Sequence, residues 1–64
     1  MTTKAKLDFI FKVLEDTETS ITKFSELTEI SRATIHHWKR GGNCSDMIRL
    51  NIAHKAAQTL EAKP

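Results

Sequence analysis

Two short runs of apolar residues limit the folds open to this chain more than any other feature. The first run holds Ile21, Phe24 and Leu27, and the second holds Ile35 and Trp38. A spacing of three residues keeps side chains on one face of a helix, so each run predicts a short helix with one buried edge. Neither run is long enough to form a stable helix alone, so the two must pack against other elements.

Serines precede both runs, at positions where they can cap the two helices. Ser20 and Ser31 each offer a side-chain oxygen to the first free amides of the helix that follows. Ile30 stands between the runs and is expected to fill the corner between the helices. Gly41 is expected to end the second helix, because glycine adopts a left-handed backbone without strain. The segment therefore predicts a helix-turn-helix at about residues 20–40. Its expected apolar core is Phe24, Ile30, Ile35 and Trp38.

Longer amphipathic segments flank this motif on both sides. Residues 3–16 predict a helix whose apolar face carries Leu7, Ile10, Phe11 and Leu14. Phe9 and Val13 widen that face, and they belong either to the core or to an edge that a second subunit covers. Residues 46–62 predict a final helix, with Ser45 as its N-cap and Asp46 in a favourable position near the helix dipole. Its apolar residues are Met47, Ile48, Leu50, Ile52, Ala53, Ala56, Ala57 and Leu60.

No stretch alternates apolar and polar residues as a strand would, so the sequence predicts an all-α fold of four to five short helices. With 64 residues, the chain is expected to form one domain over residues 1–64, without a substrate cleft of roughly 300 Å³. The single cysteine forms no internal disulfide and favours a cytoplasmic protein. The longest apolar run, Phe9-Ile10-Phe11, is too short to cross a membrane. We therefore expect no enzyme, cofactor, small-molecule ligand or membrane association.

Positive charge is concentrated in the second half of the chain. Residues 31–55 hold five lysines and arginines against one acid, whereas residues 1–30 hold four lysines against six acids. Once Ile35 and Trp38 point inward, helical geometry fixes the outward face of their helix. That face carries Arg32, Ala33, His36, His37 and Arg40, with Lys39 at its rim. A basic face without acids favours a polyanionic partner.

The stretch Glu29-Ile-Ser-Arg-Ala-Thr-Ile-His-His-Trp-Lys-Arg-Gly41 resembles the second half of the helix-turn-helix in phage Cro and CI repressors. Trp38-Lys39, followed by Arg49-Leu50-x-Ile52, is particularly similar to the all-α Cro proteins. The resemblance covers about residues 20–53. It implies a regulator that binds a near-palindromic operator in double-stranded DNA as a homodimer, with residues 31–40 as the recognition helix. It also implies a nucleoid-associated protein in the cytoplasm of a bacterial or phage-infected cell.

Residue by residue, the resemblance implies contacts to bases or adjacent phosphates by Ser31, Arg32, Ala33, His36 and His37. Among these, Arg32 has two donors for a guanine edge, and Ala33 suits a thymine methyl. We expect contacts to DNA phosphates by Ser20, Lys39, Arg40, Gly42, Asn43 and Ser45. The amides after residue 41 and the start of the last helix would form a second surface that accepts anions.

Three residues depart from the family pattern. Glu29 stands where the turn usually has glycine, which predicts either a different turn backbone or mild strain. Ser25 stands where alanine is usual, and its hydroxyl needs a backbone hydrogen bond. Ile21 stands where a phosphate-contacting glutamine is common, so only its backbone amide is carried over as an anion contact.

The same residues allow other interpretations. His36 and His37 are adjacent in a helix and point in different directions, and Cys44 and His54 lie at no recognised ligand spacing, so no metal site is expected. A helix-turn-helix that acts as a protein–protein adaptor is one alternative, and it predicts an apolar or acidic outward face. A second alternative is an excisionase-type or antitoxin-type DNA-binding protein. These residues do not distinguish such a protein from a repressor.

Overall fold

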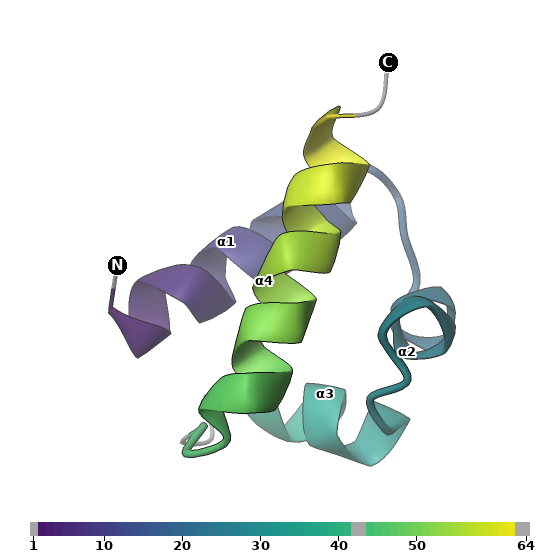
Figure 1. The fold of residues 1–64 in the computed structure, drawn as a ribbon. Coiled ribbons are helices and arrows are strands. Elements are labelled where there is room, and N and C mark those ends of the chain that lie inside the picture. Colours follow the sequence, from purple (N-terminus) through teal and green to yellow (C-terminus); the bar gives the residue numbers. More distant parts are fainter. Residues whose placement is uncertain (1, 42–43, 63–64) are drawn as a thin grey trace.

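Four helices form the structure, a computed structural model that describes residues 2–41 and 44–62. They are α1 (Thr3–Asp16), α2 (Ile21–Thr28), α3 (Arg32–Lys39) and α4 (Met47–Ala62). The most extensive packing is between α1 and α4, which cross each other, and α2 and α3 cover one end of this pair (Figure 1). The described residues contain no strand, so the all-α prediction is confirmed.

The core lies where the four helices meet, and it contains ten buried apolar residues: Ile10, Val13, Leu14, Phe24, Ile30, Ile35, Trp38, Leu50, Ala53 and Ala57. The four residues predicted as the core of the 20–40 motif are all among them. Ala53 and Ala57 are fully buried on α4, the helix that packs most extensively against α1, and such small side chains allow helices to approach closely. Val13 belongs to the core. Phe9 is half-buried against the imidazole ring of His54, with a centroid distance of 5.2 Å.

Side-chain caps begin the first three helices. Thr2, Ser20 and Ser31 accept hydrogen bonds from the amides of Ala5, Lys23 and Thr34, at 3.1, 3.0 and 3.2 Å. The two predicted serine caps are therefore confirmed. Gly41 follows α3 with a φ of +87°, and its amide donates to the Trp38 carbonyl at 3.1 Å. This is the left-handed position that was expected of glycine at the end of this helix. None of the described helices combines the length and hydropathy that crossing a membrane requires.

The N-cap predicted for α4 is wrong by one residue. Ser45 is exposed and comes before Asp46, whose carboxylate accepts a hydrogen bond from the Arg49 amide at 3.0 Å. The Asp46 carbonyl also accepts from the Leu50 amide, which places Asp46 at the cap. Hydrogen bonds from the Arg49 amide and then its side chain lower the pKa of Asp46 below its ordinary value. A carboxylate suits the electropositive start of a helix better than a hydroxyl does.

The edge that α2 buries also differs from the prediction. Phe24 is buried and Ile21 half-buried as expected, but Leu27 exposes 49% of its surface. Thr28 takes the inner position, because it lies only about 40° from Phe24 around the helix, against about 60° on the other side for Leu27. Its hydroxyl donates to the Phe24 carbonyl at 2.8 Å and accepts from the Ile30 amide at 3.3 Å. Thr28 is therefore buried with its polar group satisfied.

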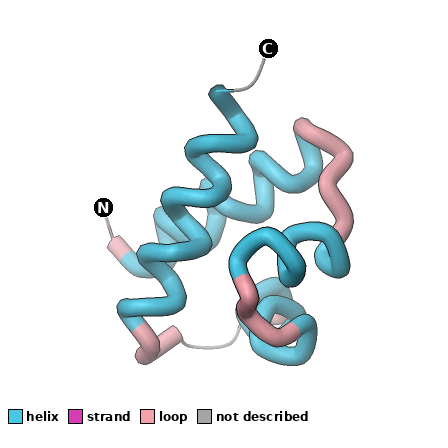
Figure 2. The backbone as a smooth tube through the Cα atoms, turned by 45° about the vertical axis from the view of Figure 1, so that its right-hand side comes forward, coloured by secondary structure: helices cyan, strands magenta, loops and turns pink. Residues whose placement is uncertain are grey.

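The turn between α2 and α3 has a backbone that favours glycine. Glu29 has φ 60° and ψ 22°, and its amide donates to the Ser25 carbonyl at 2.8 Å. The Ser25 hydroxyl donates to the Ile30 carbonyl at 2.5 Å across the same turn. Of the two alternatives for this position, the structure thus shows the left-handed backbone that glycine usually provides, which favours mild strain at Glu29 over a different turn. The backbone hydrogen bond that Ser25 needs is confirmed. Figure 2 shows how short this connection between the two helices is.

Candidate nucleic-acid interface

The outer face of α3 is open to solvent and carries no acidic residue. Ile35 and Trp38 fix the rotation of this helix, because both side chains are buried in the core. The residues that were predicted to point outward are all exposed: Arg32, Ala33, His36, His37, Lys39 and Arg40. Helical geometry therefore predicted the composition of this face correctly. The face presents cations and hydrogen-bonding imidazoles along a helix of eight residues.

The start of α3 is held by a small network of hydroxyl groups. Ser31 accepts from the Thr34 amide, and the two hydroxyl groups share a hydrogen bond of 2.8 Å. Ser31 itself is exposed and lies next to Arg32 at the first turn. These bonds therefore hold the Ser31 side chain in place at this end of α3, where Ser31, Arg32 and Ala33 are all exposed. Fixed side chains lose less conformational entropy when they bind a partner.

A hollow of about 530 Å³ joins the start of α2 to the face of α3. The N-cap Ser20 and the first residues of α2, Ile21 and Thr22, line one side of it. His36 and Lys39 line it from α3. The first amides of a helix have no partner within the helix, and the dipole there favours anions. Two of the predicted phosphate contacts, Ser20 and Lys39, thus share one hollow with a predicted base contact. The sequence alone did not show this proximity.

The predicted contacts beyond α3 are only partly described. Arg40 follows α3 directly and is exposed, and its amide donates to the His36 carbonyl at 3.1 Å. Ser45 is exposed just ahead of the cap of α4. Gly42 and Asn43 lie outside the described residues. The second anion-accepting surface expected at these positions therefore stays a prediction.

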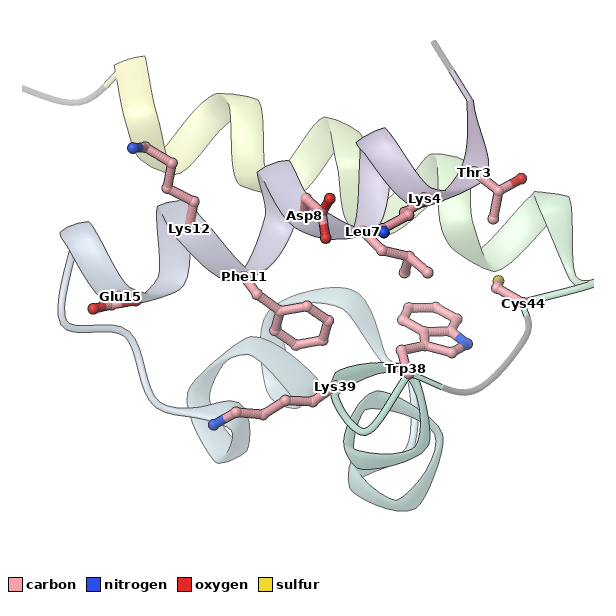
Figure 3. A pocket seen from close by; sticks show the side chains of 11 residues that line it. Thr3, Lys4, Leu7, Asp8, Phe11, Lys12, Glu15, Trp38, Lys39 and Cys44 are labelled. Atoms are coloured by element: carbon pink, nitrogen blue, oxygen red, sulfur yellow. The ribbon is translucent and has the colours of Figure 1, made fainter.

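A larger groove of about 760 Å³ runs between α1 and the end of α3 (Figure 3). Leu7, Phe11 and Trp38 give it an apolar part, and charged side chains from α1 and Lys39 surround it. The groove is open to solvent along its length and is not an enclosed substrate cleft, so the expectation that the chain has no such cleft stays a prediction. The lining residues include Cys44 and carboxylates but no histidine.

Two features of the surface were missed in the sequence. Glu15, in the last turn of α1, lines both the hollow and the groove. On α4, the isoleucines Ile48 and Ile52 expose 76% and 46% of their surface. They line a third groove of about 340 Å³ with Glu29, Ile30 and Arg49, beside the turn that leads into α3. The sequence places both isoleucines among the apolar residues of this helix without indicating which of these are buried, and the structure shows that α4 buries Leu50, Ala53 and Ala57.

Within residues 2–41 and 44–62, no three histidine, cysteine or acidic side chains gather closely enough to hold a metal ion. The ion pair found there joins Asp46 to Arg49 at the start of α4. Comparison of the chain with protein-family models, with curated proteins and with solved structures finds no match in any of the three.

Proposed function

We propose that this protein is a sequence-specific regulator that binds double-stranded DNA through a helix-turn-helix of the repressor-like class. In this proposal α2 and α3 form the motif, and α3 enters the major groove as the recognition helix. One observation carries it: the exposed face of α3 holds only neutral and basic residues and shares a hollow with the start of α2. The resemblance to the all-α Cro proteins supports the same proposal from the sequence.

The chemistry of each position suggests its role. Arg32 offers two donors to a guanine edge, Ala33 offers a methyl group to thymine, and His37 offers one hydrogen bond to a base. Ser31 and His36 reach bases or the adjacent phosphates. The contacts that position the protein on the phosphate backbone come from Ser20, the Ile21 amide, Lys39 and Arg40, with Gly42, Asn43 and Ser45 as further candidates.

A recognition helix of eight residues contacts few base pairs, so we propose that two copies bind two half-sites about 34 Å apart in a near-palindromic operator. The exposed isoleucines Ile48 and Ile52 support a second copy of the chain as the partner. Glu29 and Arg49 line the same groove, so a two-fold axis through this surface can set opposite charges against each other. Such a regulator would act on the nucleoid, in the cytoplasm of a bacterial or phage-infected cell.

Selection of binding sites from a random DNA pool tests the proposal. We expect an inverted repeat whose half-sites are one helical turn apart, bound more weakly as the salt concentration rises. Failure to select any site at about 100 mM salt, or binding that does not depend on salt, would refute the proposal. Sedimentation equilibrium measures how many copies of the protein bind one operator. Two copies for the wild type and fewer than two for Ile48→Asn would support the dimer surface.

Two variants separate base contacts from phosphate contacts. Arg32→Ala should relax the preference at one base position and cost about 1–3 kcal/mol on the selected site. Arg40→Ala should weaken binding to all sequences alike and reduce the salt slope by about one unit. Lys55→Ala is the matched control, because it removes the same charge from an exposed position of α4.

One observation favours the alternative of a protein–protein adaptor, namely that Ile48 and Ile52 are both exposed. A protein–protein adaptor should tolerate Arg32→Ala and Arg40→Ala in a partner assay and lose binding with Ile48→Asn. An excisionase-type or antitoxin-type protein would also bind DNA. The selected sites discriminate these two from a repressor, because direct repeats or sites without symmetry do not fit a two-fold dimer.

A further inference from the structure

A carboxylate stands at the edge of the surface that is proposed to bind the DNA backbone. Glu15 is exposed in the last turn of α1 and lines the hollow that also contains Ser20, His36 and Lys39. It lines the neighbouring groove as well, where Figure 3 shows its carboxylate and the Lys39 amino group at the same end. The other residues that line this hollow are neutral or basic, so Glu15 supplies its negative charge.

The stability of α1 does not explain a carboxylate at this position. The last turn of a helix carries a partial negative charge, so an acid there is unfavourable. The last turn of α1 holds no basic residue that would compensate it. Among the residues that the structure describes, Asp46 and Arg49 form an ion pair, whereas Glu15 forms none. We therefore consider how the Glu15 carboxylate affects the electrostatic potential of the adjacent hollow.

Resting on the proposed function, we propose that Glu15 limits the affinity for DNA by competing electrostatically with a backbone phosphate. A phosphate that approaches Ser20, Lys39 or the first amides of α2 enters the hollow that Glu15 lines. The like charge of the Glu15 carboxylate opposes this approach, while in the free protein it offsets the positive potential of Lys39 and the start of α2. Phosphate contacts are common to all DNA sequences, so this limit applies to operator and random DNA alike.

The test measures the affinity of Glu15→Gln for the selected operator and for a random duplex by fluorescence anisotropy. Glu26→Gln is the matched control, because Glu26 is an exposed glutamate of α2 and is not among the residues that line the hollow. Both variants raise the net charge equally, so general attraction to DNA cancels between them. We expect Glu15→Gln to bind both duplexes roughly three- to ten-fold more tightly than Glu26→Gln at low salt, with the gain shrinking as salt rises.

A double variant locates the effect in the hollow. If Glu15 acts on the phosphate that Lys39 contacts, Glu15→Gln should gain less affinity in a Lys39→Gln background than in the wild-type chain. Circular dichroism checks that each variant keeps its helices.

Equal affinities for Glu15→Gln and Glu26→Gln would overturn the inference and leave the proposed function intact. Weaker binding by Glu15→Gln would also overturn it, because Glu15 would then position Lys39 rather than compete with DNA. A wild-type protein that binds no DNA would refute the proposed function itself, and this inference with it.

Discussion

Replacing Glu29 with glycine should stabilise the protein. Glu29 has a φ of 60° at the end of α2, a left-handed conformation that costs an L-residue roughly 1–2 kcal/mol. Glycine avoids this cost but loses roughly 0.5–1 kcal/mol through the greater freedom of its unfolded chain. The difference predicts a gain of about 0.5–1 kcal/mol in the free energy of unfolding. For a domain of this size, that corresponds to an increase in Tm of roughly 2–8 °C.

The assay is urea and thermal unfolding followed by circular dichroism and by the fluorescence of Trp38, the single tryptophan of the chain. Glu29→Ala controls for the carboxylate, because alanine keeps the strained Cβ, and its stability should stay close to that of the wild type. Glu26→Gly controls for glycine itself. Glu26 lies inside α2, where glycine should cost about 1 kcal/mol. A Glu29→Gly protein that is no more stable than Glu29→Ala would refute the argument from backbone strain.

Two further predictions concern the corner before α3 and the start of α4. Ser25→Ala should destabilise the protein by about 1–2 kcal/mol in urea unfolding, because it removes the hydrogen bond to the Ile30 carbonyl, whereas Ser45→Ala should change little. Asp46→Ala should lower the unfolding midpoint at neutral pH, because α4 loses its cap. The folded-state pKa of Asp46 is lowered, so its contribution is present above the ordinary value of 3.8 and is lost as the pH falls through the folded-state pKa. The deficit of Asp46→Ala should therefore shrink in acid, and a deficit that is constant down to about pH 2 would contradict this assignment. Asp46→Asn keeps a capping side chain and is the control.

Local chemistry made the helix boundaries and the outer face of α3 predictable. Ser20 and Ser31 cap helices through bonds that span three residues, so the sequence neighbourhood contains all the partners. The rotation of α3 follows from two buried residues, Ile35 and Trp38, because a helix is rigid and its other side chains follow at 100° steps.

Apart from the α4 cap, where Asp46 and not the neighbouring Ser45 caps the helix, the errors arose where packing between helices decides which side chains are buried. Thr28 lies closer to Phe24 around α2 than Leu27 does, and it is buried because its hydroxyl also finds two backbone partners, which an apolar pattern does not indicate. Ile48 and Ile52 are exposed because α4 approaches α1 through Ala53 and Ala57, where close contact favours small residues over large ones. The place of Glu15 beside α3 depends on how the end of α1 packs, and no local signal predicts it.

The corner between α2 and α3 combines strain with three hydrogen bonds that hold it in place. The Glu29 amide donates to the Ser25 carbonyl, the Ser25 hydroxyl donates to the Ile30 carbonyl, and the Ile30 amide donates to the Thr28 hydroxyl. These contacts fix the direction in which α3 leaves the turn, and none of them uses the Glu29 side chain. Removing the strain with Glu29→Gly should therefore raise stability without moving α3, and the DNA site selected by that variant should match that of the wild type. Ser25→Ala removes one of these bonds, so it should both lower stability and weaken binding to the selected site. If Glu29→Gly instead altered the selected site, the strained residue itself would set the angle of α3.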